Sequence, residues 1–255
     1  MFEQIKAVLF DLDGTIYYGS QLIAKADQVV QAFKNAGKQV YFMTNNSTKS
    51  RQQICDKLLG MGLECGKEQI YTSGYGAALY AQNNGYKSIY VFGTDALKQE
   101  FAQMGIETSS KAEVVVVGYD MDFDYAKLTD ALQVALNAKI IIACNRERHY
   151  PGEGAKRFPG CGAMVGALEG SLGREVDYVV GKPNPLLLDI ICTQQNLKKE
   201  EILVVGDTYE SDIQMAEEYG CESIYIHDAM NHALGNNDLG GVKRVSHIRE
   251  LLKWV

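Results

Sequence analysis

The chain opens with an apolar run, residues 5–12, that ends in the stretch Asp11-Leu12-Asp13-Gly14-Thr15. An apolar run of this length that stops at a glycine is typical of a buried β-strand entering a turn. Residues 26–36 carry apolar side chains at helical spacing, and Gly37 follows them, which predicts a helix with a glycine C-cap. Residues 39–43 predict a second strand. The beginning of the chain is therefore expected to fold as strand, helix, strand.

The end of the chain repeats this alternation. A helix is expected at residues 185–195, a strand at 201–205, a helix at 211–219 and a strand at 223–226. Strands that alternate with helices pair in parallel through right-handed crossovers, and helices then cover both faces of the sheet. The fold class expected is α/β, with a doubly wound, Rossmann-like parallel sheet.

The middle of the chain has the same character. It predicts further strands and helices, at residues 88–92, 94–104, 114–118, 125–136 and 139–143, followed by a long loop at 146–162. No repeat of short period is visible. Because the two ends share one architecture and the middle behaves as a second unit of the same class, the simplest organisation is one domain made of both chain ends with a second inserted between them. The expected boundaries are 1–73 and 181–255 for the core and 74–180 for an inserted α/β cap.

Composition excludes several classes of protein. Of 255 residues, 46% are hydrophobic and 22% charged, as in a packed protein and unlike a disordered chain. The net charge of −7 disfavours a nucleic-acid partner, because such binding depends on phosphate neutralisation. No apolar run approaches the roughly 20 residues that span a bilayer. Six cysteines without metal or redox spacing favour reduced thiols and a cytoplasmic location.

Polar residues follow four of the expected strands directly. They are Asp11 and Asp13, Thr44 and Asn45, Lys182 after a further short apolar strand expected at residues 178–180, and Asp207 with Asp212. In doubly wound sheets, ligands bind at the carboxyl ends of the strands, so these side chains are expected to converge.

Each group also has a plain structural explanation when taken singly. Asp11 and Asp13 fit a turn that stops a strand, and Thr44 fits a helix N-cap. Lys182 fits a solvated loop, while Asp207 and Asp212 fit a cap and a first-turn acid. The functional alternative is that paired carboxylates divide attack and proton transfer between them.

Charge decides in favour of a shared site. Two like charges ~4 Å apart at an effective dielectric of ~20 repel by about 4 kcal/mol, so four aspartates at one rim require cations. Lys182 supplies one positive charge. A hard divalent ion with oxygen ligands supplies two more, and Mg²⁺ is the natural choice because it accepts carboxylates together with a phosphate.

These motifs, in this order, resemble those of the haloacid dehalogenase superfamily. The insert and the wording Gly181-Lys182-Pro183-Asn184-Pro185 resemble its subfamily IIA, the NagD-like, 4-nitrophenylphosphatase-type enzymes. The resemblance extends over nearly the whole chain. It implies a phosphatase that works through an aspartyl phosphate, with an inserted cap of the C2 type.

The resemblance also implies roles for individual residues. Asp11 would be the nucleophile and Asp13 the general acid and base. Thr44 and the backbone at Asn45 would bind the phosphoryl group, and Lys182 would neutralise its charge. Mg²⁺ would be bound by Asp11, the main-chain carbonyl of Asp13 and Asp207, with Asp212 in support.

The cap departs from the family pattern after Asn145, where Arg146-Glu147-Arg148 stands in place of Pro-Asp. Asn145, Arg146, Arg148 and His149 are candidates for contact with the leaving group, or else belong to a solvated loop. Sugar phosphates, nucleoside monophosphates and 4-nitrophenyl phosphate all fit such a site. The expected partner is a small phosphorylated metabolite, with no nucleic acid and no membrane, and the protein is expected to be a monomer or homodimer.

Other functions compete with this one. A phospho-accepting signalling or binding module would also place aspartates at strand ends, but Asp13 and an inserted domain argue against it. A phosphomutase is possible on the same core motifs. A nucleotide-binding kinase or dehydrogenase is disfavoured because neither G-x-x-x-x-G-K-[ST] nor a strand followed by G-x-G-x-x-G occurs.

Overall fold

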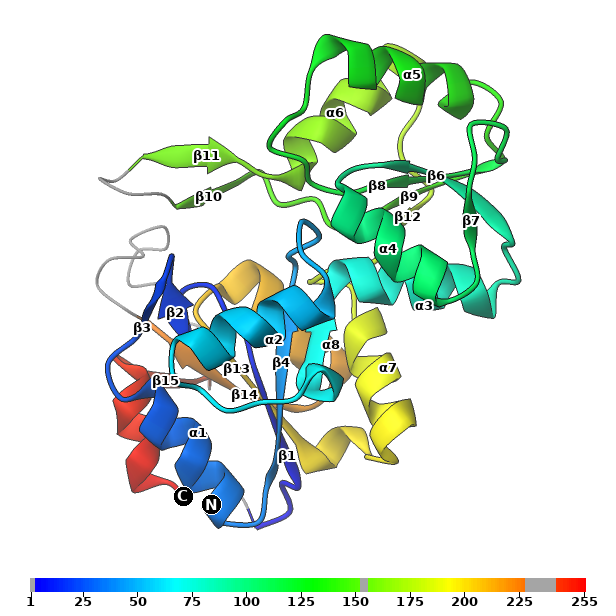
Figure 1. Ribbon diagram of the computed structural model, residues 1–255. Helices are drawn as coiled ribbons and strands as arrows, with labels where there is room; N and C mark the ends of the chain where they lie inside the picture. Colours follow the sequence, from blue (N-terminus) through cyan, green and yellow to red (C-terminus); the bar gives the residue numbers. More distant parts are fainter. Residues whose placement is uncertain (1–2, 152–155, 228–241) are drawn as a thin grey trace. The chain divides into compact units, whose positions relative to one another are not determined.

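A computed structural model describes residues 3–151, 156–227 and 242–255 (Figure 1). Contacts divide the chain into two compact units. The first comprises residues 1–44, 55–71 and 188–255, and the second comprises residues 45–54 and 72–187. The domain boundaries expected from the sequence stay a prediction.

The first unit is built on a six-stranded sheet in the order β15-β14-β13-β1-β4-β5. The strands are β1 (Ala7–Phe10), β4 (Gln39–Thr44), β5 (Ile70–Thr72), β13 (Ile202–Gly206), β14 (Glu222–Ile226) and β15 (Lys243–Val245). All residues of β1 are buried, because this strand pairs in parallel with β13 on one side and β4 on the other. Chain segments about 200 residues apart therefore share the centre of one sheet.

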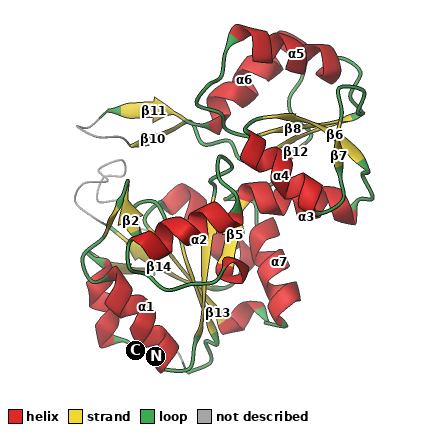
Figure 2. Ribbon diagram, viewed as in Figure 1, coloured by secondary structure: helices red, strands yellow, loops and turns green. Residues whose placement is uncertain are grey.

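Helices flank this sheet (Figure 2). They are α1 (Ala26–Asn35), α2 (Arg51–Gly60), α7 (Leu186–Gln195), α8 (Gln214–Tyr219) and the short helices η1 (Lys67–Gln69), η3 (Lys199–Glu201), η4 (Tyr209–Ile213) and η5 (Ile248–Lys253). Helix α1 packs on β4 and η5, and α8 packs on β14. A small hairpin, β2 (Tyr17–Tyr18) and β3 (Gln21–Leu22), follows β1.

The second unit has its own five-stranded sheet, in the order β12-β9-β8-β6-β7, with parallel pairing between neighbours. Its strands are β6 (Ser88–Phe92), β7 (Glu107–Thr108), β8 (Val114–Val117), β9 (Ile140–Ala143) and β12 (Tyr178–Val179). Its helices are α3 (Ser73–Asn83), α4 (Asp95–Gln103), α5 (Tyr125–Ala135) and α6 (Cys161–Leu172).

The all-valine strand β8 shows why helices cover both faces of this sheet. Val114 and Val116 lie in the cluster with residues of α3 and α4, such as Phe101. Val115 and Val117 lie in the cluster with residues of α5 and α6. Because side chains alternate along a strand, an uninterrupted apolar run needs a cover on each face.

The α/β class expected from the sequence is confirmed by these two parallel sheets with their helices. Two local expectations were wrong. The loop expected at 146–162 contains an antiparallel pair, β10 (His149–Pro151) and β11 (Arg157–Pro159). The helix expected at 211–219 begins earlier, as the π-helical turn η4. Short two-stranded pairs and wide turns leave little periodicity in a sequence.

Within the three described segments, no helix combines the length and the apolar character that crossing a membrane requires.

Candidate active site

Three buried carboxylates meet in the first unit. Asp11 follows β1, Asp207 follows β13, and Asp212 lies in η4. One ligand atom from each lies within 4.8 Å of the others, and their exposures are 7%, 6% and 1%. Adjacent parallel strands bring the first two together, because the carboxyl ends of β1 and β13 share one edge of the sheet.

Two glycines allow this close approach. A Cβ on Gly14 would fall 2.2 Å from Asp207 Oδ2, and one on Gly206 would fall 2.4 Å from the Cβ of Asp212. Gly14 also has a φ of +93°, which strains an L side chain. The packing of the carboxylates against the backbone therefore requires glycine at both positions.

Asp212 is held by two hydrogen bonds with the backbone of Thr208, the residue just before η4. The Thr208 N–H donates to Asp212 Oδ2 at 3.2 Å, while the Asp212 N–H donates to the Thr208 carbonyl at 2.9 Å. Asp207 Oδ1 accepts a hydrogen bond from the Thr15 hydroxyl at 3.4 Å. Carboxylates held so close in a buried place favour a hard divalent cation, which prefers oxygen ligands.

Asp13 differs from these three because it is exposed. The hydroxyl of Tyr17 donates to Asp13 Oδ2 at 3.1 Å. Burial, and then the charge of Asp13, raise the pKa of Tyr17 far above its ordinary value, so its hydroxyl keeps its proton. Asp13 is thus held by a donor, yet stays open to solvent.

The remaining core candidates are divided between the units. Thr44 is buried at the end of β4 in the first unit, whereas Asn45 and Lys182 are buried in the second. The Lys182 N–H donates to Asn45 Oδ1 at 2.7 Å, and Asn45 Nδ2 donates to the Lys182 carbonyl at 3.1 Å. The Asn45 carbonyl accepts the Ser73 hydroxyl and Asn145 Nδ2, each at 2.7 Å. Asn45 and Lys182 are therefore joined at both backbone groups of the lysine.

The cap candidates have partners within the second unit. Asn145 is buried, and its Oδ1 accepts the Glu147 N–H at 3.0 Å. Arg146 pairs with Glu169 of α6, and His149 Nε2 lies 3.1 Å from Arg157 Nη1 across the β10–β11 pair. Arg148 is exposed.

Sequence reasoning missed two residues near the candidates. Tyr17 stands four positions after Asp13, and the turn that places them together gives no periodic signal. Glu147 Oε1 accepts a hydrogen bond from Asn45 Nδ2 at 3.0 Å, although the two residues are 102 positions apart in the sequence. One signal in the sequence pointed to Glu147: it belongs to the stretch Arg146-Glu147-Arg148, which stands where the family pattern has Pro-Asp.

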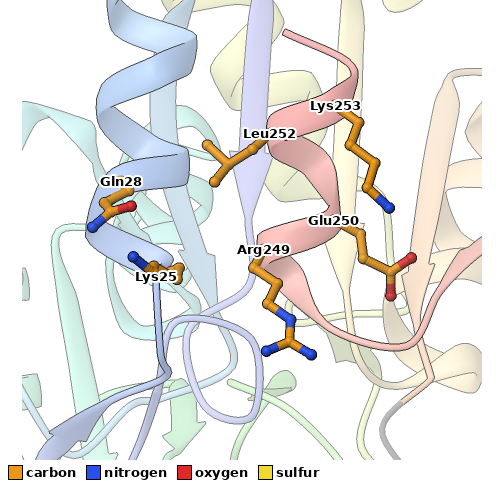
Figure 3. Close-up of a pocket in the computed structure, with 6 residues that line it drawn as sticks. All are labelled: Lys25, Gln28, Arg249, Glu250, Leu252 and Lys253. Atoms are coloured by element: carbon orange, nitrogen blue, oxygen red, sulfur yellow. The ribbon is translucent and has the colours of Figure 1, made fainter.

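Figure 3 shows a pocket of about 420 Å³ in the first unit, lined by none of the site residues described above. Its lining residues come from the start of α1 and from η5: Lys25, Gln28, Arg249, Glu250, Leu252 and Lys253. None of the six is a candidate named from the sequence, so the chemistry expected from the motifs lies elsewhere.

Comparison with known proteins agrees with this arrangement. Family models match residues 8–107, as a haloacid dehalogenase-like hydrolase, and residues 179–233, as a related hydrolase. The sugar-phosphatase AraL of Bacillus subtilis is 32% identical over 223 residues, which cover 86% of this chain and 82% of that protein.

Solved structures give the same result over greater lengths. A putative NagD protein has a TM-score of 0.92 at 27% identity, with all of both chains covered. A glycerol phosphate phosphatase from Mycobacterium tuberculosis, solved in complex with magnesium, has a TM-score of 0.85 at 26% identity. That match covers 98% of this chain and 78% of the other.

The parallel α/β fold carries a buried carboxylate cluster at the ends of its strands, and the relatives place this protein among the phosphatases. The chain belongs to the haloacid dehalogenase-like hydrolases, on the NagD-like branch that the four motifs predicted.

Proposed function

We propose that this phosphatase is a Mg²⁺-dependent hydrolase of small phosphomonoesters that works through an aspartyl phosphate. The observation that carries the proposal is the meeting of three buried carboxylates within 4.8 Å, beside an exposed fourth, Asp13. Buried carboxylates at this spacing are costly without a cation. A phosphate dianion can approach such a site only when cations offset most of its negative charge.

The residues fit a bound Mg²⁺ by their chemistry. Asp11 and Asp207 would hold the ion with the main-chain carbonyl of Asp13, and Asp212 would support them. All of these donors are oxygens, which suits Mg²⁺ better than a softer ion. When bound, the ion supplies positive charge that stabilises the phosphoryl oxygens during transfer.

The reaction divides between two carboxylates. A carboxylate oxygen of Asp11 attacks phosphorus, and the bond from phosphorus to the ester oxygen breaks while Asp13 gives that oxygen its proton. Water then attacks the aspartyl phosphate and Asp13 takes the proton from it. The bond between phosphorus and Asp11 breaks, which releases inorganic phosphate and restores the enzyme.

The phosphoryl group would be bound by Thr44, the backbone at Asn45 and Lys182. These roles rest on the family motifs. In support, Lys182 is only 4% exposed, and a buried ammonium group needs a negative partner. A phosphoryl group has the charge that such a partner needs.

Small esters are the proposed substrates, and the relatives support this class: one is named for sugar phosphates and another for glycerol phosphate. Nucleoside monophosphates and 4-nitrophenyl phosphate belong to the same chemical class. Asn145, Arg146, Arg148 and His149 stay candidates for contact with the leaving group. A cytoplasmic monomer or homodimer, acting without nucleic acid or membrane, stays part of the proposal.

The test uses 4-nitrophenyl phosphate and a panel of sugar phosphates, with and without Mg²⁺. We expect the wild-type protein to release phosphate over many turnovers, and expect Asp11→Asn to lose at least about 10³-fold in kcat because the nucleophile is gone. Asp27→Asn removes an exposed carboxylate of α1 in the same unit and should leave kcat unchanged.

Removal of metal provides the second arm. Chelation with EDTA should abolish turnover, and added Mg²⁺ should restore it. Full activity of Asp11→Asn, or of the chelated enzyme, would contradict the mechanism. Phosphorylation that stops after one equivalent, with no further phosphate release, would instead support a phospho-accepting module.

A further inference from the structure

Tyr17 is attached to the turn that carries Asp13 by its backbone as well as by its side chain. Its N–H donates to the Leu12 carbonyl at 3.1 Å, and its carbonyl accepts the Gly14 N–H at 2.9 Å. It is also the first residue of the β2–β3 hairpin, where it pairs with Leu22. The backbone of Tyr17 is therefore fixed relative to that of Asp13.

The ring of Tyr17 is fixed as well. The side chain is almost fully buried, with 2% of the residue exposed. The ammonium group of Lys57, on α2, lies 3.5 Å from the ring centroid, a cation–π contact that covers one face of the ring. A hydroxyl on a ring held in this way has a defined position.

That hydroxyl donates to Asp13 Oδ2 at 3.1 Å, while Asp13 itself is exposed. An exposed aspartate otherwise exchanges between rotamers, and only one of them serves a given proton transfer. A donor fixed on one carboxyl oxygen limits this exchange and so favours one orientation of the carboxyl group.

We propose that Tyr17 is a positioning residue, whose hydroxyl holds Asp13 in the orientation that delivers a proton to the departing ester oxygen. This inference rests on the proposed function, since it assigns a partner to the general acid named there. Tyr17 acts through Asp13, and its ring packing is a separate, structural contribution.

The proposal predicts a dependence on the leaving group. An alkoxide leaves poorly without a proton, so hydrolysis of an alkyl phosphate depends on a well-placed acid. The 4-nitrophenolate ion is stable without one. Loss of the Tyr17 hydroxyl should therefore slow the first reaction much more than the second, an effect that general damage to the fold would not produce.

The test is Tyr17→Phe, which keeps the ring and its packing against Lys57 while it removes the hydroxyl. For glycerol phosphate, kcat/KM should fall by about tenfold or more, and for 4-nitrophenyl phosphate by less than about twofold. We choose kcat/KM because it reports the step in which the ester oxygen leaves. Tyr18→Phe, at the neighbouring exposed position, is the matched control and should change neither value.

A double-mutant cycle with Asp13→Asn gives an independent result. Once Asp13 is an amide, removal of the Tyr17 hydroxyl should cost no further selectivity between the two esters, because both changes affect the same group. Thermal unfolding should show Tyr17→Phe folded at the assay temperature.

Equal losses on the two substrates would overturn the inference, as would additive losses in the double variant. Failure of the proposed function has a separate sign: the wild-type enzyme with Mg²⁺ would release no phosphate from either ester. If the wild type is active and Asp13→Asn shows no preference for the aryl ester, the acid role of Asp13 fails, and the role of Tyr17 with it.

Discussion

Gly14 shows how a single residue controls the spacing of the acidic site. Its φ of +93° turns the chain after β1, and its missing side chain leaves room for the Asp207 carboxylate. Gly19, five residues later, also has a positive φ of +56°, but nothing lies within 4 Å of the place its Cβ would occupy. A comparison of alanine variants at the two glycines therefore separates the effect of backbone strain from the effect of a steric clash with Asp207.

We expect Gly19→Ala to lose about 1–2 kcal/mol of unfolding free energy because it places an alanine at positive φ, and Gly14→Ala to lose more because its Cβ would also fall 2.2 Å from Asp207 Oδ2. Only Gly14→Ala should displace Asp207, and it should raise the Mg²⁺ concentration for half-maximal activity by about tenfold or more. Urea unfolding and Mg²⁺ titration of phosphatase activity measure these two effects. Equal Mg²⁺ requirements in the two variants would show that the Gly14 contact does not matter.

At the scale of elements, the start of α3 depends on a buried cap. Thr72 is fully buried at the end of β5, and its Oγ1 accepts the Tyr75 N–H at 2.9 Å. The first N–H groups of a helix have no partner within the helix, so a side-chain acceptor replaces one of the missing bonds. No water is available to replace it at a buried position.

Thr72→Ala should therefore destabilise the protein by about 1–2 kcal/mol. Thr72→Ser keeps the oxygen and should lose clearly less than Thr72→Ala. Chemical denaturation with fluorescence detection compares the two variants. A serine variant as unstable as the alanine variant would mean that packing of the threonine methyl group, and not the cap, stabilises this junction.

At the scale of the whole molecule, both units contain buried thiols, and all six cysteines are free. Burial is the main cause that raises the pKa of Cys161 to about 12 in the second unit and that of Cys221 to about 12 in the first. The ordinary thiol value is 9.0, so the folded protein holds these protons more tightly than the unfolded chain. Such a group stabilises the fold fully below pH 9 and loses that contribution as pH rises towards 12.

We therefore expect the unfolding free energy to fall above pH 9, by about 1.4 kcal/mol per pH unit for each such thiol. Cys161→Ala removes one titrating group and should reduce the slope by about that amount between pH 9 and 11. Urea titrations in the presence of a reductant, at pH 8 to 11, measure the slope. Identical slopes for wild type and variant would contradict the assignment.

Much of the fold follows from local patterns in the sequence. The apolar runs of β1 and β8 predict buried parallel strands, because a strand covered on both faces excludes water from every side chain. Helix ends at glycines were equally visible. The β10–β11 pair and the π-helical turn η4 were not, since neither element produces a repeat long enough to detect.

The candidate site follows the same division. The sequence by itself determined that acidic side chains such as Asp11 and Asp207 meet at one edge of the sheet, because the end of a buried strand is a local property and strand ends converge in a parallel sheet. Only the tertiary structure decided which neighbours form hydrogen bonds with the candidate residues. The contacts of Tyr17 with Asp13 and of Asn45 with Lys182, 137 residues away, depend on how turns close and segments pack. Such contacts join groups whose separation along the chain carries no period, so no local pattern encodes them.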